Sequence, residues 1–147
     1  MNLTQYFTLD ELTASDVAAR LGLDNTPPPS VVQNLHALAE KLEEVRCVLG
    51  RPVIISSGYR SPKVNAAVGS KATSAHLQGL AADFICPQFG SPLEVAEELA
   101  AAGVKFDQLI NEYGRWVHIG LRAAYSTWRG ELLTIDRSGA RIGLSRV

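Results

Sequence analysis

The spacing of hydrophobic and polar positions predicts one long amphipathic helix in the first half of the chain. Apolar residues recur alternately four and three apart along this segment: Val31, Leu35, Leu38, Leu42, Val45 and Leu49. This spacing forms one continuous stripe on a helix, and its short length favours packing against a core over a coiled coil. Ser30 is the expected N-cap and Gly50 the expected end. His36 lies beside the stripe without a ligand-type partner, so we expect an ordinary surface or boundary histidine.

Capping motifs predict four shorter helices. The first begins at a capping box of Thr8 with Glu11. The other three are expected over 16–21 ended by Gly22, from Ser61-Pro62 to about Val68, and from Ser91-Pro92 ended by Gly103. Serine or threonine hydroxyls accept hydrogen bonds from free amides of a first turn, and glycine permits the left-handed backbone that ends a helix. Prolines at 27–29 predict an extended connection to the long helix. We therefore expect residues 1–29 to form a helical arm packed on the core.

The remaining apolar runs have the length and composition of strands. They cover residues 52–56, 80–86, 106–113, 116–121 and 132–135. We expect the first to be a short buried strand, the third and fourth to form a hairpin, and the last to belong to a further hairpin or edge strand. The order of helices and strands predicts an α+β fold, in which helices flank a small, mostly antiparallel sheet within a single domain over residues 1–147.

Composition narrows the classes of function. A formal net charge of −1 gives no electrostatic reason to expect nucleic-acid binding. No apolar run approaches the roughly 20 residues of a membrane span, and the N-terminus lacks the basic and apolar regions of a signal peptide. We therefore expect a monomer without membrane partners, made as a soluble cytoplasmic product. Cys47 and Cys86 form neither a disulfide framework nor a CxxC metal motif, so we expect two buried free thiols.

Three residues have the side chains and the setting of a zinc site. His76 and Asp83 stand seven positions apart, and His118 falls in the strand-like segment WVHIG. A carboxylate in the middle of an apolar strand is costly to bury unless it is paired or bound to a metal. Three protein ligands leave a fourth zinc position for water, which distinguishes catalytic from structural zinc. The working hypothesis is a hydrolase with one zinc ion.

Glu112 is the first candidate for the base that takes a proton from the attacking water. A three-residue turn over 113–115 would set Glu112 opposite Trp116, on the same face of the sheet as His118, whereas a two-residue turn would put it on the other face. Asp107 is the reserve candidate.

Two further residues are candidates for binding the substrate. The Arg60 guanidinium would hold a substrate carboxylate or the oxyanion of a tetrahedral intermediate. Ser74 would donate a hydrogen bond to the substrate or steady the loop before His76. A surface salt bridge for Arg60 and a capping hydroxyl for Ser74 are the alternatives.

The segments SGYRSPKVNAAVG, SAHLQGLAADF and FDQLINEYGRWVHIGL resemble the zinc D-Ala-D-Ala carboxypeptidase and dipeptidase family, and most closely its small phage-encoded branch of peptidoglycan-cleaving endolysins. The similarity covers roughly Phe7 to Leu121 and implies the fold shared with lysostaphin-type enzymes and the hedgehog signalling domain. The residue roles that it implies are the zinc ligands His76, Asp83 and His118, the substrate-binding arginine Arg60, and the serine before the first ligand, Ser74.

One position departs from the family pattern. Many relatives have the catalytic glutamate three residues before the last histidine ligand, where this chain has Arg115. Glu112 lies six residues before that histidine, at a position that is acidic in the phage-like branch. Either Glu112 reaches the water through a different turn, or this copy is a weakened enzyme.

The resemblance implies a zinc peptidase, either endopeptidase or carboxypeptidase, acting on the stem peptides of bacterial peptidoglycan. Such an enzyme would reach the wall through a separately made membrane hole or inside a virion. The D-amino acids and free carboxylates of these peptides suit an arginine anchor. A non-catalytic, zinc-containing wall-binding or phage structural module is the alternative, and a cytoplasmic D-Ala-D-Ala dipeptidase is a third possibility.

Overall fold

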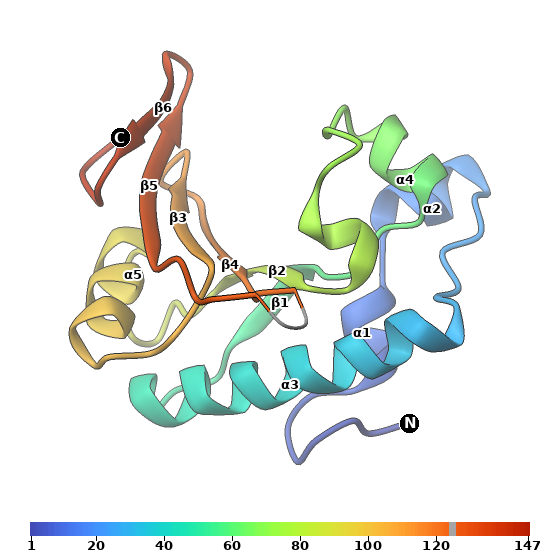
Figure 1. Cartoon of the computed structure of the whole chain (residues 1–147), viewed down its shortest axis with the longest axis horizontal. Helices are drawn as coiled ribbons and strands as arrows, with labels where there is room; N and C mark the ends of the chain where they lie inside the picture. Colours follow the sequence, from blue (N-terminus) through green and yellow to red (C-terminus); the bar gives the residue numbers. More distant parts are fainter. Residues whose placement is uncertain (124–125) are drawn as a thin grey trace.

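A six-stranded sheet in the order β1-β2-β4-β3-β5-β6 forms the centre of the computed structural model, which describes residues 1–123 and 126–147 (Figure 1). The strands are β1 (Ile54–Ser57), β2 (Ala81–Ile85), β3 (Gln108–Glu112), β4 (Trp116–Gly120), β5 (Glu131–Asp136) and β6 (Gly139–Ile142). Neighbouring strands are antiparallel except β3 and β5, which run parallel. The predicted α+β fold with a mostly antiparallel sheet is therefore confirmed, as is the hairpin in the tail.

The helices follow the predicted caps with one exception. They are α1 (Leu9–Thr13), α2 (Asp16–Leu21), α3 (Pro29–Leu49), α4 (Pro62–Ala67), the 3-10 helix η1 (Ala75–Gln78) and α5 (Pro92–Ala101). The capping boxes at Thr8 and Ser91 are present, and Ser61 caps α4. The prediction of Ser30 as the N-cap of α3 is wrong, because α3 begins at Pro29 and its N-cap is Pro28. Proline is well suited to the first helical turn, where its missing amide costs no hydrogen bond.

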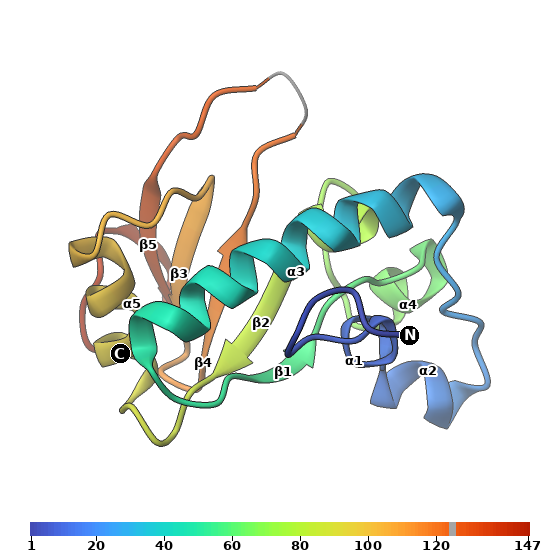
Figure 2. The ribbon, with the colours of Figure 1, turned by 90° about the horizontal axis from the view of Figure 1, so that it is seen from below.

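Helices α3 and α5 pack against one face of the sheet (Figure 2). The predicted stripe of α3 is buried along its whole length, with Gly50 ending the helix as expected. It meets apolar residues on the inner face of three strands: Ala82, Phe84, Leu109, Val117 and Ile119. Each of these five is fully buried, so the core lies between the helices and this face of the sheet.

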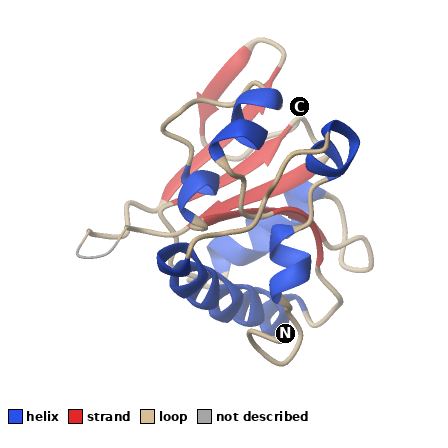
Figure 3. Ribbon diagram, turned by 90° about the vertical axis from the view of Figure 1, so that its right-hand side faces the viewer, coloured by secondary structure: helices blue, strands red, loops and turns tan. Residues whose placement is uncertain are grey.

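The helices α3 and α5 leave the opposite face of the sheet for polar residues on its central strands. Figure 3 shows the sheet and helices from the side. Asp83 of β2 pairs with His118 of β4, which pairs in turn with Ile110 of β3. Two positions further along the same face, Trp116 pairs with Glu112. Because side chains alternate between faces along a strand, burying one set of residues against α3 and α5 turns this second set away from the core.

Two predictions about burial are wrong. Strand β1 lies at an edge of the sheet and Ile54 is 51% exposed, because only β2 pairs with it. Cys86 is buried as predicted, but Cys47 is exposed, since it lies on the outer side of α3, two positions after the buried Val45. Both cysteines are free, and His36 is exposed as expected. Among the described residues, no helix combines the length and apolar character needed to cross a membrane.

Candidate metal centre

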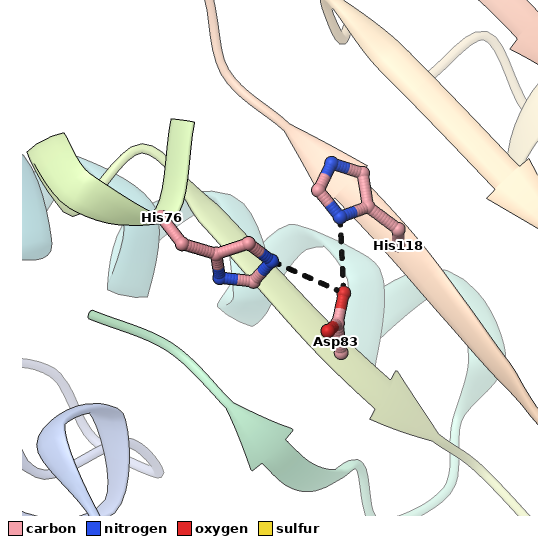
Figure 4. A group of neighbouring side chains, drawn as sticks. All are labelled: His76, Asp83 and His118. Atoms are coloured by element: carbon pink, nitrogen blue, oxygen red, sulfur yellow. Dashed lines mark hydrogen bonds and ion pairs between the residues drawn. The ribbon is translucent and has the colours of Figure 1, made fainter. Parts of the chain in front are cut away.

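His76, Asp83 and His118 meet on the open face of the sheet (Figure 4). His76 belongs to η1, and the other two residues are paired neighbours on β2 and β4. One potential ligand atom from each lies within 4.8 Å of the others, and all three side chains are buried. The sequence therefore correctly identified a set of residues that folding brings together, although 35 positions separate Asp83 from His118.

The spacing of these atoms suits a tetrahedral metal ion. His118 Nδ1 lies 3.0 Å and His76 Nε2 lies 3.4 Å from the same Asp83 oxygen, Oδ1. Zinc holds nitrogen and oxygen ligands at about 2.0–2.1 Å, which places neighbouring tetrahedral ligands roughly 3.3 Å apart. Two imidazoles and one carboxylate are also a ligand set that zinc accepts. The residues present therefore fit a zinc ion.

The backbone carbonyl of Gly58 orients the His76 ring. His76 Nδ1 lies 2.7 Å from this oxygen, and because a carbonyl can only accept, Nδ1 must carry the proton. In the neutral ring the lone pair is then on Nε2, the atom that faces Asp83. Metal-binding histidines commonly hold their second nitrogen in this way, which fixes the tautomer and the direction of the ring.

Asp83 is held as a carboxylate despite its burial. Burial opposes ionisation, but the hydrogen bond from His118 and the electrostatic attraction of the two adjacent imidazoles outweigh it and hold the pKa of Asp83 below its usual value. Arg60 also forms an ion pair with Asp83, with its Nη2 3.4 Å from Asp83 Oδ2. Arg60 Nε also donates to Ser57 Oγ at 3.1 Å, so the guanidinium is fixed at the edge of the site. A deprotonated carboxylate is the form that binds a metal.

Glu112 lies beside the three candidate ligands. The turn over 113–115 has three residues, Glu112 pairs with Trp116, and Glu112 Oε1 is 3.7 Å from His118 Nδ1. Of the two registers considered, the structure therefore has the one that puts Glu112 on the face of the candidate ligands. Burial raises the pKa of Glu112, and the nearby Asp83 carboxylate raises it further. Arg115 is exposed in the turn.

A cavity of about 470 Å³ connects the predicted site residues with solvent. Its lining includes six of the seven site candidates from the sequence: Arg60, Ser74, His76, Asp83, Glu112 and His118. Ser74 also caps η1, because its Oγ accepts a hydrogen bond from the His76 amide at 3.3 Å. The reserve candidate Asp107 lies just before β3, at the opposite end of that strand from Glu112, and forms two 2.7 Å hydrogen bonds with Arg129.

Sequence reasoning missed three parts of this site. Gly58 contributes only a backbone oxygen, which no side-chain pattern reveals. Tyr113 and Trp116 form one wall of the cavity, with ring centroids 5.6 Å apart. The one available signal was their position at the predicted hairpin turn, Tyr113 at its start and Trp116 directly after it.

A buried His-Asp-His set beside a cavity, next to a carboxyl group with a raised pKa, is the arrangement of a metal-dependent hydrolase. Sequence comparison then identifies the family. The family model described as Peptidase M15 matches residues 5–120, and the chain belongs to this peptidase family. The resemblance to the zinc D-Ala-D-Ala carboxypeptidase group is thereby confirmed. Comparison with curated proteins finds no match.

Proposed function

We propose that this protein is a zinc-dependent peptidase that hydrolyses peptide bonds in the stem peptides of bacterial peptidoglycan. The observation that carries the proposal is the convergence of His76, Asp83 and His118 on one buried point, with Glu112 in the same cavity. Membership of the M15 peptidases supports the reaction class. The resemblance to phage endolysins supports the wall peptide as substrate.

The three ligands would hold one zinc ion. When bound, zinc lowers the pKa of its water towards about 7 and polarises a carbonyl group. Two neutral imidazoles and one carboxylate leave the site with net positive charge, which favours both effects. The Gly58 carbonyl and the Asp83 pairing keep the ligand atoms directed at this point before the ion arrives.

Glu112 acts as the general base and then as the acid. Its carboxyl group is close to His118 but is not one of the three grouped ligand atoms, so it is free to accept a proton from the attacking water. Because burial raises its pKa, it holds this proton more readily than an exposed glutamate and can pass it to the leaving amine. Arg115, at the usual glutamate position, is not required for this step.

Arg60 and Ser74 position the peptide. The Arg60 side chain is largely buried at the cavity wall, and its second contact with Ser57 holds it in place. A fixed guanidinium offers paired donors to a carboxylate or to an oxyanion. Stem peptides carry free carboxylates, which supports peptidoglycan over an ordinary protein substrate. Ser74, already used as a cap, presents its hydroxyl at the same cavity.

The test is release of new amine termini from purified peptidoglycan by protein loaded with one equivalent of zinc. Mass spectrometry of the fragments would identify the bond that is cut. Glu112→Gln should retain zinc and lower turnover by about 10²–10⁴-fold, the usual contribution of general acid–base catalysis. Glu97→Gln, an exposed glutamate on α5, is the matched control and should leave turnover unchanged.

Two results would overturn this assignment. Zinc-loaded protein that releases no amine from any peptidoglycan type would instead support a non-catalytic wall-binding or structural module. Full turnover in Glu112→Gln would place the base elsewhere.

A further inference from the structure

A second cavity, of about 620 Å³, adjoins the candidate metal centre. It shares Tyr113 and Trp116 with the metal cavity and continues to Arg115 in the β3–β4 turn and Arg137 in the β5–β6 turn. The two cavities are therefore neighbours on either side of one aromatic pair. A substrate that lies across the metal site towards this pair would reach the second cavity next.

Strand register places the two turns that line the second cavity at the same end of the sheet as Glu112. Glu112, which lines the metal cavity, pairs with Trp116 on one side and with Ile135 on the other. The β3–β4 turn and the β5–β6 turn both begin just beyond this row. The Tyr113 amide also donates to the Ile135 carbonyl at 2.7 Å, which ties the two turns together.

Tyr113 has an unusual backbone conformation at this junction. Its φ is +57°, and it is the only non-glycine residue with positive φ among the described residues. Such a conformation costs a bulky residue free energy and occurs mainly in tight turns and at functional sites. Here it holds the Tyr113 ring next to Trp116, between the two cavities.

Two arginine side chains line the second cavity. Arg115 and Arg137 are both exposed, and neither forms an ion pair with another described residue. The acidic residue in the lining, Asp136, is already occupied by Arg141 and by hydrogen bonds from Ser138. These bonds also fix the turn that carries Arg137. Two available guanidinium groups beside aromatic rings are suited to a carboxylate on a peptide.

We propose that this second cavity is a subsite for a carboxylate-bearing part of the peptide substrate, recognised by Arg115 and Arg137. The inference rests on the proposed peptidase function and extends it to substrate selection. It also gives Arg115 a role in binding in place of the glutamate expected there. The β5–β6 hairpin that completes the subsite lies beyond residues 5–120, so the family match does not include it.

The test compares two synthetic stem peptides that contain the same scissile bond. One has free carboxylates on the residues away from that bond, and the other has carboxamides. We expect the native protein to have the higher kcat/KM for the carboxylate peptide, mainly through a lower KM. Arg115→Gln and Arg137→Gln should each reduce this preference, by about tenfold for one lost charge-assisted hydrogen bond. Arg20→Gln, an exposed arginine on α2, is the matched control and should keep the native preference.

Failure of the subsite and failure of the peptidase are distinguishable. Equal kcat/KM for both peptides in the native protein would refute the subsite while leaving the peptidase intact. If the native protein cleaves neither peptide, calorimetric titration of both peptides into Glu112→Gln protein still tests the subsite. Tighter binding of the carboxylate peptide than of the carboxamide peptide would support the subsite if adding Arg115→Gln removes the difference. Equal binding of the two peptides would overturn the subsite.

Discussion

Replacing Gly79 by alanine should disturb both the core and the metal centre. Gly79 ends η1 with a φ of +69°, and its amide donates to the His76 carbonyl at 3.3 Å. A Cβ at this position would lie 2.9 Å from Val31 Cγ1 and 3.1 Å from Leu35 Cγ, both on α3. The first distance is shorter than van der Waals contact allows, and Leu35 is fully buried. Either η1 must move away from α3 or the core must rearrange.

The expected loss of stability has two parts. A left-handed backbone costs an alanine about 1–2 kcal/mol, and overpacking a closed core costs typically about 1–3 kcal/mol. Gly79→Ala should therefore lower the free energy of unfolding by roughly 2–5 kcal/mol. Gly22→Ala is the matched control, because Gly22 also ends a helix at a φ of +65° but has no atom within 4 Å of the added Cβ. Gly22→Ala should therefore lose only the stability that the left-handed backbone costs.

Urea unfolding of both variants measures this difference, and a zinc competition titration measures its effect on the site. Because η1 carries His76, moving η1 away from α3 should weaken zinc binding in Gly79→Ala but not in Gly22→Ala. Equal losses of stability in the two variants would show that contact with α3 is not what requires glycine at position 79. Unchanged zinc affinity in Gly79→Ala would show that the position of η1 does not control the ligand.

Three further predictions concern the core, the metal and the β5–β6 turn. Leu42→Ala, which empties a fully buried position, should lower the free energy of unfolding in urea by about 2–5 kcal/mol, whereas Ile142→Ala, at a 95% exposed position, should change it little. At about a thousandfold excess over its Kd, zinc should stabilise the fold by about 4 kcal/mol and raise Tm in calorimetry by roughly 8–16 °C; an equal rise in Asp83→Asn would contradict the ligand assignment. Hydrogen bonds from Ser138 and Arg141 lower the pKa of Asp136 to about 2 from 3.8. Since the folded-state pKa is depressed, the stability that these hydrogen bonds contribute is complete above pH 3.8 and is lost as the pH falls through about 2. NMR of the Ser138 amide would detect this loss, and an amide signal that does not respond to pH would refute the prediction.

Local patterns in the sequence determined most of the secondary structure. The four-and-three spacing along α3, the Thr8 and Ser91 capping boxes and the paired β-rich runs each depend on residues close together in the chain, and each prediction is confirmed. The isolated carboxylate in β2 also pointed to the site, because burying Asp83 without a partner would be too costly.

Tertiary structure alone decided the details that join distant segments. Sheet order makes β1 an exposed edge, since strand composition does not determine which strands become neighbours. The length of one turn sets the face on which Glu112 lies, because a shift of one residue turns a strand side chain to the other side. The Gly58 carbonyl that orients His76, and the meeting of Arg115 with Arg137 at one cavity, depend on backbone positions far apart in the chain. Periodicity reports only on near neighbours along the sequence, so contacts of this kind become visible only in the folded chain.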